Sequence, residues 1–279
     1  MKKTILITGA SAGIGKSTAK KFASEGWNVI ATMRSPEKEQ ELTKLEDVLV
    51  TKIDVENRDS IKAAIAAGIE RFGKIDVVVN NAGILTLGGF EVTTDEQVKH
   101  QFGVNLFGVL DMVKAILPHF RENKSGTIIN VSSQGGRITF PAMCLYHSSK
   151  FAVEGFTEGI SYELLPLNIR VKIVEPGSTS TDNAGSYLLA KSDEVKVYDE
   201  VTEEGMDNWY KYDTPAEPED VAALIFTAAN DESDRLRYMI GTDTELYFGQ
   251  RQKPDQEYVD YMRQRFIPKL MEASNEITK

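Results

Sequence analysis

The stretch TGASAGIG near the N-terminus constrains the fold more than any other part of the sequence. An apolar run that predicts a strand (4–8) leads into it, and a helical pattern (14–25) follows it. Gly9 permits a tight turn, Gly13 lets the backbone approach a phosphate, and Gly15 allows close contact between helix and strand. The helix N-terminus offers free N–H groups and a positive dipole end to a pyrophosphate. Strand, turn and helix thus stand in the order that a dinucleotide-binding unit requires.

The rest of the chain repeats this alternation. Further strands are predicted at 28–32, 48–53, 76–80, 126–132, 169–176 and 238–241, and helices near 36–46, 57–72 and 102–120. The strand candidates are almost continuously apolar, which suits strands covered on both faces. We therefore expect a single α/β domain over residues 1–279, with a doubly wound, Rossmann-type, mostly parallel sheet of about seven strands and helices on both faces. In such a fold the ligand lies beyond the carboxyl ends of the strands.

Two segments fall outside this rhythm. Residues 178–215 form a long excursion, interpreted either as a lid over the substrate or as a plain surface loop, and a helical tail is expected at about 250–279. Residues 191–220 contain 11 Asp and Glu and 3 Lys and Arg, a net charge of −8. If this segment covers the site, a strongly anionic substrate is disfavoured. Five side chains could give the excursion an apolar inner face: Leu188, Tyr198, Trp209, Tyr210 and Tyr212.

Composition excludes several classes of protein. The net charge of −10 argues against a general nucleic-acid-binding protein, which needs a basic face. The single cysteine, Cys144, rules out an internal disulfide or a cysteine-based metal site, and it fits a reducing, cytoplasmic compartment. The most apolar long stretch, 102–120, contains Asn105, Asp111 and Lys114, so a buried helix is expected there and no membrane span. No metal site is expected.

The pentapeptide YHSSK brings three ionisable side chains together. Tyr146 and Lys150 are four residues apart and share one face of the predicted helix. A nearby ammonium favours the charged form of a tyrosine, so we expect Lys150 to lower the pKa of Tyr146 and suit it to proton transfer. His147 lies about 100° round the helix, and with Ser148 and Ser149 it is interpreted as helix surface or packing. YxxxK is a weak motif by itself, so other motifs must decide its meaning.

Six motifs follow one another along the chain: TGASAGIG, NNAG (80–83), Asn105, Ser133, YHSSK and PGSTST (176–181). Together they resemble the short-chain dehydrogenase/reductase family, in its compact single-domain branch. The stretch PLNIRVKIVEPGSTSTD and the tail after RYMIGTD look most like the hydroxysteroid and retinol dehydrogenase-like side of that family. The resemblance covers roughly residues 3–243. It implies hydride transfer between a nicotinamide and a carbonyl carbon, with Tyr146 as general acid and base.

The same resemblance implies roles for further residues. Ser133 would hold the substrate oxygen, and Lys150 would tune Tyr146 and bind the nicotinamide ribose. Asn105 would anchor a water that links the lysine to solvent, or would have a purely structural role. Asp54 would flank the adenine, or would simply cap the following helix. The cofactor contacts implied are Gly9, Ser11, Gly13, Ile14, Gly15, Arg34, Ser35, Asp54, Val55, Asn81, Ala82, Gly83, Tyr146, Lys150, Gly177 and Thr181.

The end of the second predicted strand indicates which nicotinamide cofactor is used. An enzyme that prefers NAD usually has an acidic residue there, which binds the ribose 2′-hydroxyl. Here Met33 stands at that position and Arg34 follows. A guanidinium matches a 2′-phosphate through two charge-assisted hydrogen bonds, and Ser35 could add a hydroxyl. We predict NADP(H), with NAD(H) as the weaker candidate; Arg34 as a merely solvated charge remains the alternative, since Ala12 supplies no second cation.

The expected substrate is a small, neutral, partly apolar ketone, aldehyde or secondary alcohol. The predicted helices at 102–120 and 150–165 are apolar over wide faces, and a sheet covers only one side of each, so a homodimer or homotetramer is expected. Two other functions stay open. One is an NADP(H)-binding redox sensor without turnover, and the other is a nucleotide-sugar epimerase or dehydratase, which can also use a YxxxK pair.

Overall fold

Seven parallel strands form the centre of the computed structural model, which describes residues 2–181, 187–212 and 214–277. The strand order is β3-β2-β1-β4-β6-β7-β9. The bounds are β1 Thr4–Ile7, β2 Asn28–Met33, β3 Val48–Lys52, β4 Val77–Asn80, β6 Gly126–Val131, β7 Ile169–Pro176 and β9 Arg237–Ile240. The chain runs outward from β1 in both directions, so the strand order reverses between β1 and β4. The prediction of a doubly wound α/β fold is confirmed.

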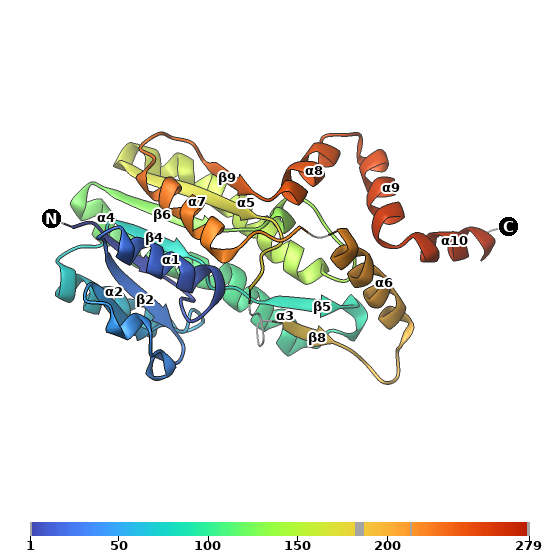
Figure 1. Cartoon of the computed structure of the whole chain (residues 1–279), viewed down its shortest axis with the longest axis horizontal. Helices are drawn as coiled ribbons and strands as arrows, with labels where there is room; N and C mark the ends of the chain where they lie inside the picture. Colours follow the sequence, from blue (N-terminus) through green and yellow to red (C-terminus); the bar gives the residue numbers. More distant parts are fainter. Residues whose placement is uncertain (1, 182–186, 213, 278–279) are drawn as a thin grey trace.

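Helices cover both faces of this sheet (Figure 1). One face carries α1 (Gly13–Ser24) and α7 (Pro218–Asn230), and the other carries α2 (Arg58–Phe72), α4 (Gly108–Asn123) and α5 (Cys144–Leu164). Successive residues of β1 show why its sequence is apolar throughout. Ile5 and Ile7 pack with the first set of helices, whereas Leu6 packs with the second, and all three are fully buried.

A second layer of elements lies beyond the carboxyl ends of the strands (Figure 1). It comprises a two-stranded sheet of β5 (Leu85–Gly88) and β8 (Tyr187–Ala190), and the helices α3 (Asp95–Phe102), α6 (Val197–Tyr212), α8 (Thr242–Arg251), α9 (Asp255–Phe266) and α10 (Pro268–Ile277). A separate aromatic cluster joins α6, α8 and α9 to the segment before α5, with Phe140, Tyr247 and Phe266 at its centre. Through Tyr258, Met262 and Phe266 in this cluster, α9 packs onto the main domain.

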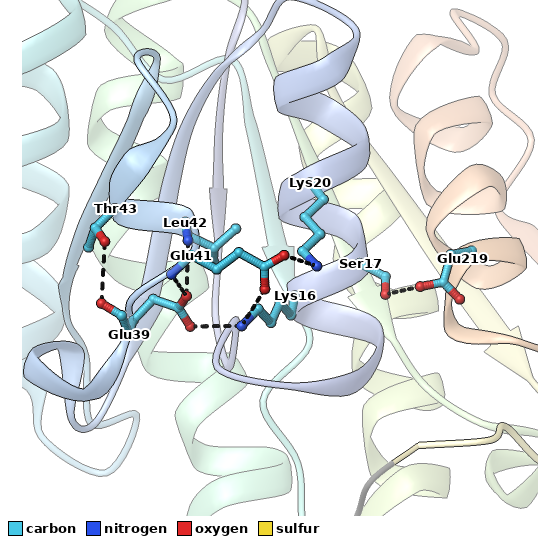
Figure 2. Close-up of polar contacts among 8 residues, drawn as sticks. All are labelled: Lys16, Ser17, Lys20, Glu39, Glu41, Leu42, Thr43 and Glu219. Atoms are coloured by element: carbon cyan, nitrogen blue, oxygen red, sulfur yellow. Dashed lines mark hydrogen bonds and ion pairs between the residues drawn. The ribbon is translucent and has the colours of Figure 1, made fainter.

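Two predicted helices differ from the structure. The segment 36–46 forms two short 3-10 turns, Pro36–Lys38 and Leu42–Lys44, because Leu42 alone is buried and ionic contacts fix the rest. Figure 2 shows these contacts: the carboxylate of Glu39 accepts from the backbone N–H groups of Glu41 and Leu42 and pairs with Lys16 of α1 at 3.2 Å. Such bonds satisfy the backbone locally and replace a helix.

The other departure lies in the apolar stretch 102–120. The expected helix is interrupted by a π-helical turn, Gly103–Phe107, between α3 and α4. π-turns of this kind often mark functional positions, because they re-aim a side chain within a helix. Asn105 stands in the middle of this turn and is 1% exposed.

Candidate active site

A cavity of about 520 Å³ opens at the carboxyl ends of the strands, where loops from both halves of the sheet meet. Most of the residues predicted from the sequence line it: Gly9, Ser11, Gly13, Ile14, Arg34, Asp54, Val55, Asn81, Ala82, Gly83, Ser133, Tyr146, Lys150, Gly177 and Thr181. Three predicted residues do not line it, namely Gly15, Ser35 and Asn105. Gly15 and Asn105 lie behind the lining, where they support it, and Ser35 precedes the first 3-10 turn.

The glycine turn after β1 has the shape of a phosphate cradle. Gly9 and Gly13 have φ angles of +68° and +52°, which glycine adopts without strain. A Cβ on Gly9 would stand 2.9 Å from the Cα of Ala82, and a Cβ on Gly13 would stand 3.0 Å from Thr181 Cγ2. The helix α1 begins at Gly13, so its free N–H groups face the same turn. These residues fit a dinucleotide whose pyrophosphate lies against the turn.

At the end of β2, Arg34 faces the cavity and has no partner among the residues that the structure describes. Met33 is buried, and Arg34 is exposed at the cavity wall with no hydrogen bond or ion pair to any residue of the described ranges. Lys16, the nearest cation on α1, differs in this respect, because Glu39 and Glu41 hold its ammonium at 3.2 and 3.1 Å (Figure 2). Arg34 is therefore available to an anionic group, whereas Lys16 is already paired.

Asp54 and Val55 line the cavity after β3. The alternative role for Asp54, a cap on the next helix, belongs instead to Asn57, whose side chain accepts from the N–H groups of Asp59 and Ser60. The carboxylate of Asp54 accepts from the backbone N–H of Glu56 at 3.1 Å. Asp54 thus faces the cavity and does not start a helix.

Tyr146 and Ser133 approach the cavity from different elements. Tyr146 lies in the first turn of α5, and Ser133 follows β6 with its hydroxyl accepting from the backbone N–H of Gly135 at 3.0 Å. Burial raises the pKa of Tyr146, while a hydrogen bond with Ser133 acts in the opposite direction. The two hydroxyls therefore stand close enough to bind one oxygen atom between them.

Lys150 lies one turn further along α5, and its ammonium donates to the backbone oxygen of Val131 at 2.9 Å. Burial lowers the pKa of Lys150 to about 8, and Glu154 on the next turn raises it slightly. The expectation that Lys150 lowers the pKa of Tyr146 is wrong for this structure. Nζ stands 5.9 Å from the Tyr146 ring centroid, and the largest influence on the pKa of Tyr146 is its own desolvation, which raises it.

Asn105 holds the loop that follows β4. Its side-chain oxygen accepts from Ile84 N at 2.8 Å, and its amide donates to Ile84 O at 2.9 Å and to Ser149 Oγ at 3.1 Å. Sequence reasoning missed two partners in this network. Gln101 binds the backbone of Ile84 and Thr86, and Ser149 donates to Tyr146 O at 2.7 Å. The only sequence signal for them is a polar residue one helical turn from a motif position.

His147 is buried among aromatic rings, as the interpretation of packing predicts. It is 2% exposed, its Nδ1 accepts weakly from Phe140 N at 3.4 Å, and burial lowers its pKa to about 3. Its ring lies 5.7 Å from that of Phe140 and 5.8 Å from that of Tyr146. His147 is therefore a neutral, buried side chain that lines this cavity.

Apolar side chains form the far end of the cavity, beyond Tyr146: Leu85, Phe140, Met143 and Trp209. Trp209 of α6 stacks on Phe140 with a centroid distance of 5.9 Å, so the excursion does contribute an inner face. Tyr210 does not share this face, because it is 68% exposed. Tyr198 and Cys144 instead line a second, mostly apolar cavity of about 650 Å³ between α5 and α6.

The described ranges of the chain contain neither a candidate metal site nor a candidate membrane span. No cluster of three or more His, Cys, Asp or Glu side chains there could hold a metal ion. None of the helices there combines the length and apolarity that crossing a membrane requires.

Comparisons with known proteins identify the family. The model of the short chain dehydrogenase family matches residues 3–191. The chain belongs to this family. An uncharacterized oxidoreductase of Schizosaccharomyces pombe is 41% identical over 230 residues, which are 80% of this chain and 94% of that protein. The resemblance noted from the six motifs is thereby confirmed.

Solved structures agree with this assignment. A short-chain dehydrogenase from Streptomyces avermitilis superposes with a TM-score of 0.79 and 30% identity, covering 99% of this chain and 95% of that one. A structure of ElxO with NADP bound gives 0.72 and 29%, covering 86% and 98%. A 3-ketoacyl-(acyl-carrier-protein) reductase from Brucella melitensis, complexed with NADH, gives 0.72 and 27%, covering 85% and 96%. Proteins of this fold thus bind either nicotinamide cofactor.

Proposed function

We propose that this oxidoreductase interconverts a neutral, partly apolar carbonyl compound and its secondary alcohol with NADP(H). The observation that carries the proposal is the meeting of Ser133, Tyr146 and Lys150 at one cavity whose other end is the glycine cradle. A reacting carbonyl and a dinucleotide can therefore occupy one continuous space. The bound cofactor would supply hydride transfer, and the protein would supply position and electrostatics.

The side chains take separate parts in this reaction. Ser133 and Tyr146 would both bind the substrate oxygen, and the Tyr146 hydroxyl would give or take its proton. Lys150 has a pKa of about 8, so near neutral pH it can both carry a charge beside Tyr146 and pass a proton on. Asn105 keeps the loop at Ile84 in place beside them. Lys150 would also bind the ribose next to the nicotinamide.

The preference for NADP(H) rests on Arg34. It is a cation at the cavity wall without a partner in the described ranges, and the acidic side chain that would favour a 2′-hydroxyl is replaced by the buried Met33. Dissociation constants of the two cofactors test this preference. Arg34→Ala should weaken NADPH binding by about 10- to 100-fold, the value of a charge-assisted pair, and leave NADH binding unchanged. If the wild-type protein binds NADH as tightly as NADPH or more tightly, the preference for NADP(H) is wrong.

The substrate class follows from the apolar end of the cavity and from the acidic excursion. Phe140, Met143 and Trp209 offer no charge to an anionic substrate, and residues 191–220 carry a net charge of −8. We infer that α6 and the segment before it close over the substrate as a lid. Residues 182–186 and 213, which belong to the predicted excursion, lie outside the described residues.

Replacement of Tyr146 by Phe tests the reaction itself. With NADPH and a panel of ketones and aldehydes, turnover should fall at least about 1,000-fold, because the proton donor is lost, while the dissociation constant of NADPH stays within about threefold. Substantial remaining turnover would refute the role of Tyr146. The same panel separates the alternatives, since a redox sensor would consume no NADPH and an epimerase or dehydratase would yield an isomerised or dehydrated sugar nucleotide without net oxidation.

We also infer a homo-oligomer. Several large apolar side chains are exposed on α5, on the π-helical turn packed against it and on the 3-10 turn that follows α5 (Leu165–Leu167): Phe107, Phe151, Tyr162 and Leu165. A second copy of the chain would cover them.

A further inference from the structure

The carboxylate of Asp243 is buried where the C-terminal segment meets the active site. Asp243 is 5% exposed and lies in the first turn of α8. Its Oδ2 accepts from Gln134 Nε2 at 2.8 Å and from the backbone N–H of Ser178 at 3.2 Å. Its Oδ1 accepts from the backbone N–H of Thr244 at 2.9 Å. Three donors from three segments therefore converge on one carboxylate.

Two of these segments carry the proposed chemistry. Gln134 directly follows Ser133, which would bind the substrate oxygen, and Ser178 directly follows Gly177, which lines the cofactor cavity. The two segments follow neighbouring strands, β6 and β7, whose backbone pairing ends with the hydrogen bond from Ser132 N to Val174 O. Asp243 is thus a bridge between them.

The surroundings fix this carboxylate tightly. A Cβ added to Gly177 or to Gly241 would fall on Oδ1 of Asp243, so only glycine fits at both positions. Gly241 has a φ of +114°, and the backbone N–H of Gly177 donates to Ile240 O at 2.8 Å. The absence of a Cβ at these two glycines leaves room for the carboxylate, and its three hydrogen bonds hold it in one geometry.

The alternative is that Asp243 serves only to start α8. That role needs the bond to Thr244 alone, and α8 begins after Gly241 with no side-chain cap. It leaves unexplained why a buried carboxylate, costly to desolvate, also accepts from Gln134 and Ser178. Those two bonds lead to the active site.

We propose that Asp243 is a positioning residue that couples the Ser133 turn to the Gly177–Ser178 segment, so that the C-terminal part of the chain sets the alignment of substrate oxygen and nicotinamide. The proposal rests on the proposed function, since it assigns alignment at that same site. Asp243 touches neither reactant, and it acts through Gln134 and Ser178. An amide in place of the carboxylate would oppose one donor with an N–H group and loosen the bridge.

The test uses the full-length chain with Asp243→Asn, and Asp255→Asn as matched control. Asp255 is 87% exposed and pairs with Arg251 on the surface. Asp243→Asn should lower kcat about 10- to 100-fold, because misplacement of about 1 Å costs this much, while KM and the dissociation constant of NADPH stay within about threefold. The control should match wild type. A kcat within twofold of wild type would overturn the proposal.

A second readout needs neither cofactor nor turnover. Amide hydrogen exchange of the cofactor-free protein should become faster in peptides covering residues 133–136 and 176–181, and should stay unchanged in β1 to β3. Faster exchange throughout the chain would show a merely structural role and would count against the proposal. If the wild-type protein reduces no carbonyl compound, the proposed function fails, yet this exchange pattern still decides whether Asp243 couples the two segments.

Gln134→Leu removes the same bridge from its other end. It keeps the proposal testable if Asp243→Asn does not fold. It should lower kcat in the same direction, and the double variant should be no slower than Asp243→Asn alone, because both changes remove one coupling. Independent, multiplying losses in the double variant would contradict a shared role.

Discussion

At the residue scale, burial sets the charge states of the proposed active site. It lowers the pKa of Lys150 to about 8, lowers that of His147 to about 3 and raises that of Tyr146. Each shift disfavours the charged form of the side chain, so each costs stability when that form is imposed. Burial thus disfavours charge on all three side chains, but Lys150, with a pKa of about 8, still carries its charge at neutral pH. One of the three groups gives a measurable dependence of stability on pH.

That group is His147, which should make the protein sensitive to mild acid. Its folded pKa of about 3 lies below the unfolded value of 6.5, so the unfolded state binds the extra proton first as pH falls. Stability is complete above about pH 6.5 and is lost as pH falls toward 3, by up to about 4 kcal/mol. His147→Gln, which keeps an acceptor for Phe140 N, should flatten this dependence in urea titrations between pH 7 and 4.

His100→Gln is the control for that comparison, because His100 pairs with Glu56 at the surface. The pKa of the buried Glu175 is raised to about 7, mainly by burial, so this carboxyl contributes with the opposite sign over the same range. Glu175 is present in every variant and cancels when variant and wild-type curves are subtracted. Parallel curves for His147→Gln and wild type would contradict the prediction.

At the element scale, sequence patterns predicted those strands and turns whose formation depends on local chemistry or on continuous burial. The five inner strands were predictable because each is an apolar run covered on both faces, whereas the edge strands β3 and β9 are less buried and were predictable from their apolar residues alone. The glycine turn was predictable because only a few residue types fit its geometry. The two-stranded sheet of β5 and β8 was not predictable, since its strands are four residues long and pair across a long separation in sequence. The role of Asp243 depends on tertiary contacts that no local pattern records.

The start of α1 gives a sharp test of the glycine turn. A Cβ on Gly15 would stand 2.5 Å from Asn81 Nδ2 and would also meet the backbone oxygen of Gly9, so Gly15→Ala must displace backbone. We expect a loss of about 2 kcal/mol or more in stability and at least about 100-fold weaker NADPH binding. Gly249→Ala in α8, where a Cβ meets nothing, should gain about 0.5 kcal/mol. Fluorescence titration and thermal unfolding measure both, and unchanged binding in Gly15→Ala would contradict the cradle.

Neighbouring residues of α6 provide a matched pair for the inner face of the excursion. Trp209 lines the cavity and stacks on Phe140, whereas Tyr210 is 68% exposed. Trp209→Ala should raise KM for apolar ketones about tenfold or more, because an aromatic contact of roughly 1.5 to 3 kcal/mol is lost, and should leave the dissociation constant of NADPH unchanged. Tyr210→Ala should change neither quantity. Equal effects of the two changes on KM would show that α6 does not contact the substrate.

At the scale of the whole molecule, the helices on the two faces of the sheet differ in how many apolar side chains they leave exposed. The helices α1 and α7 pack against each other and bury Phe22, Trp27 and Val221 between them and the sheet. On the opposite side, α5 leaves Phe151 and Tyr162 42% and 70% exposed. Its glycines Gly155 and Gly159 have open space around them, so a helix of a second copy could approach closely. This asymmetry is the physical basis for the inferred oligomer.

Charge on that face should therefore break the oligomer. Phe151→Glu combined with Tyr162→Glu places two like charges where a second copy would desolvate them, which costs several kcal/mol per interface and makes a dimer dissociate at micromolar concentration. Leu246→Glu, at a side chain 41% exposed on α8, is the control and should leave the mass unchanged. Light scattering of the purified protein in solution measures the mass of each variant. A monomeric wild-type protein at micromolar concentration would show that this apolar face has another use, and a double variant that stays oligomeric would move the interface elsewhere.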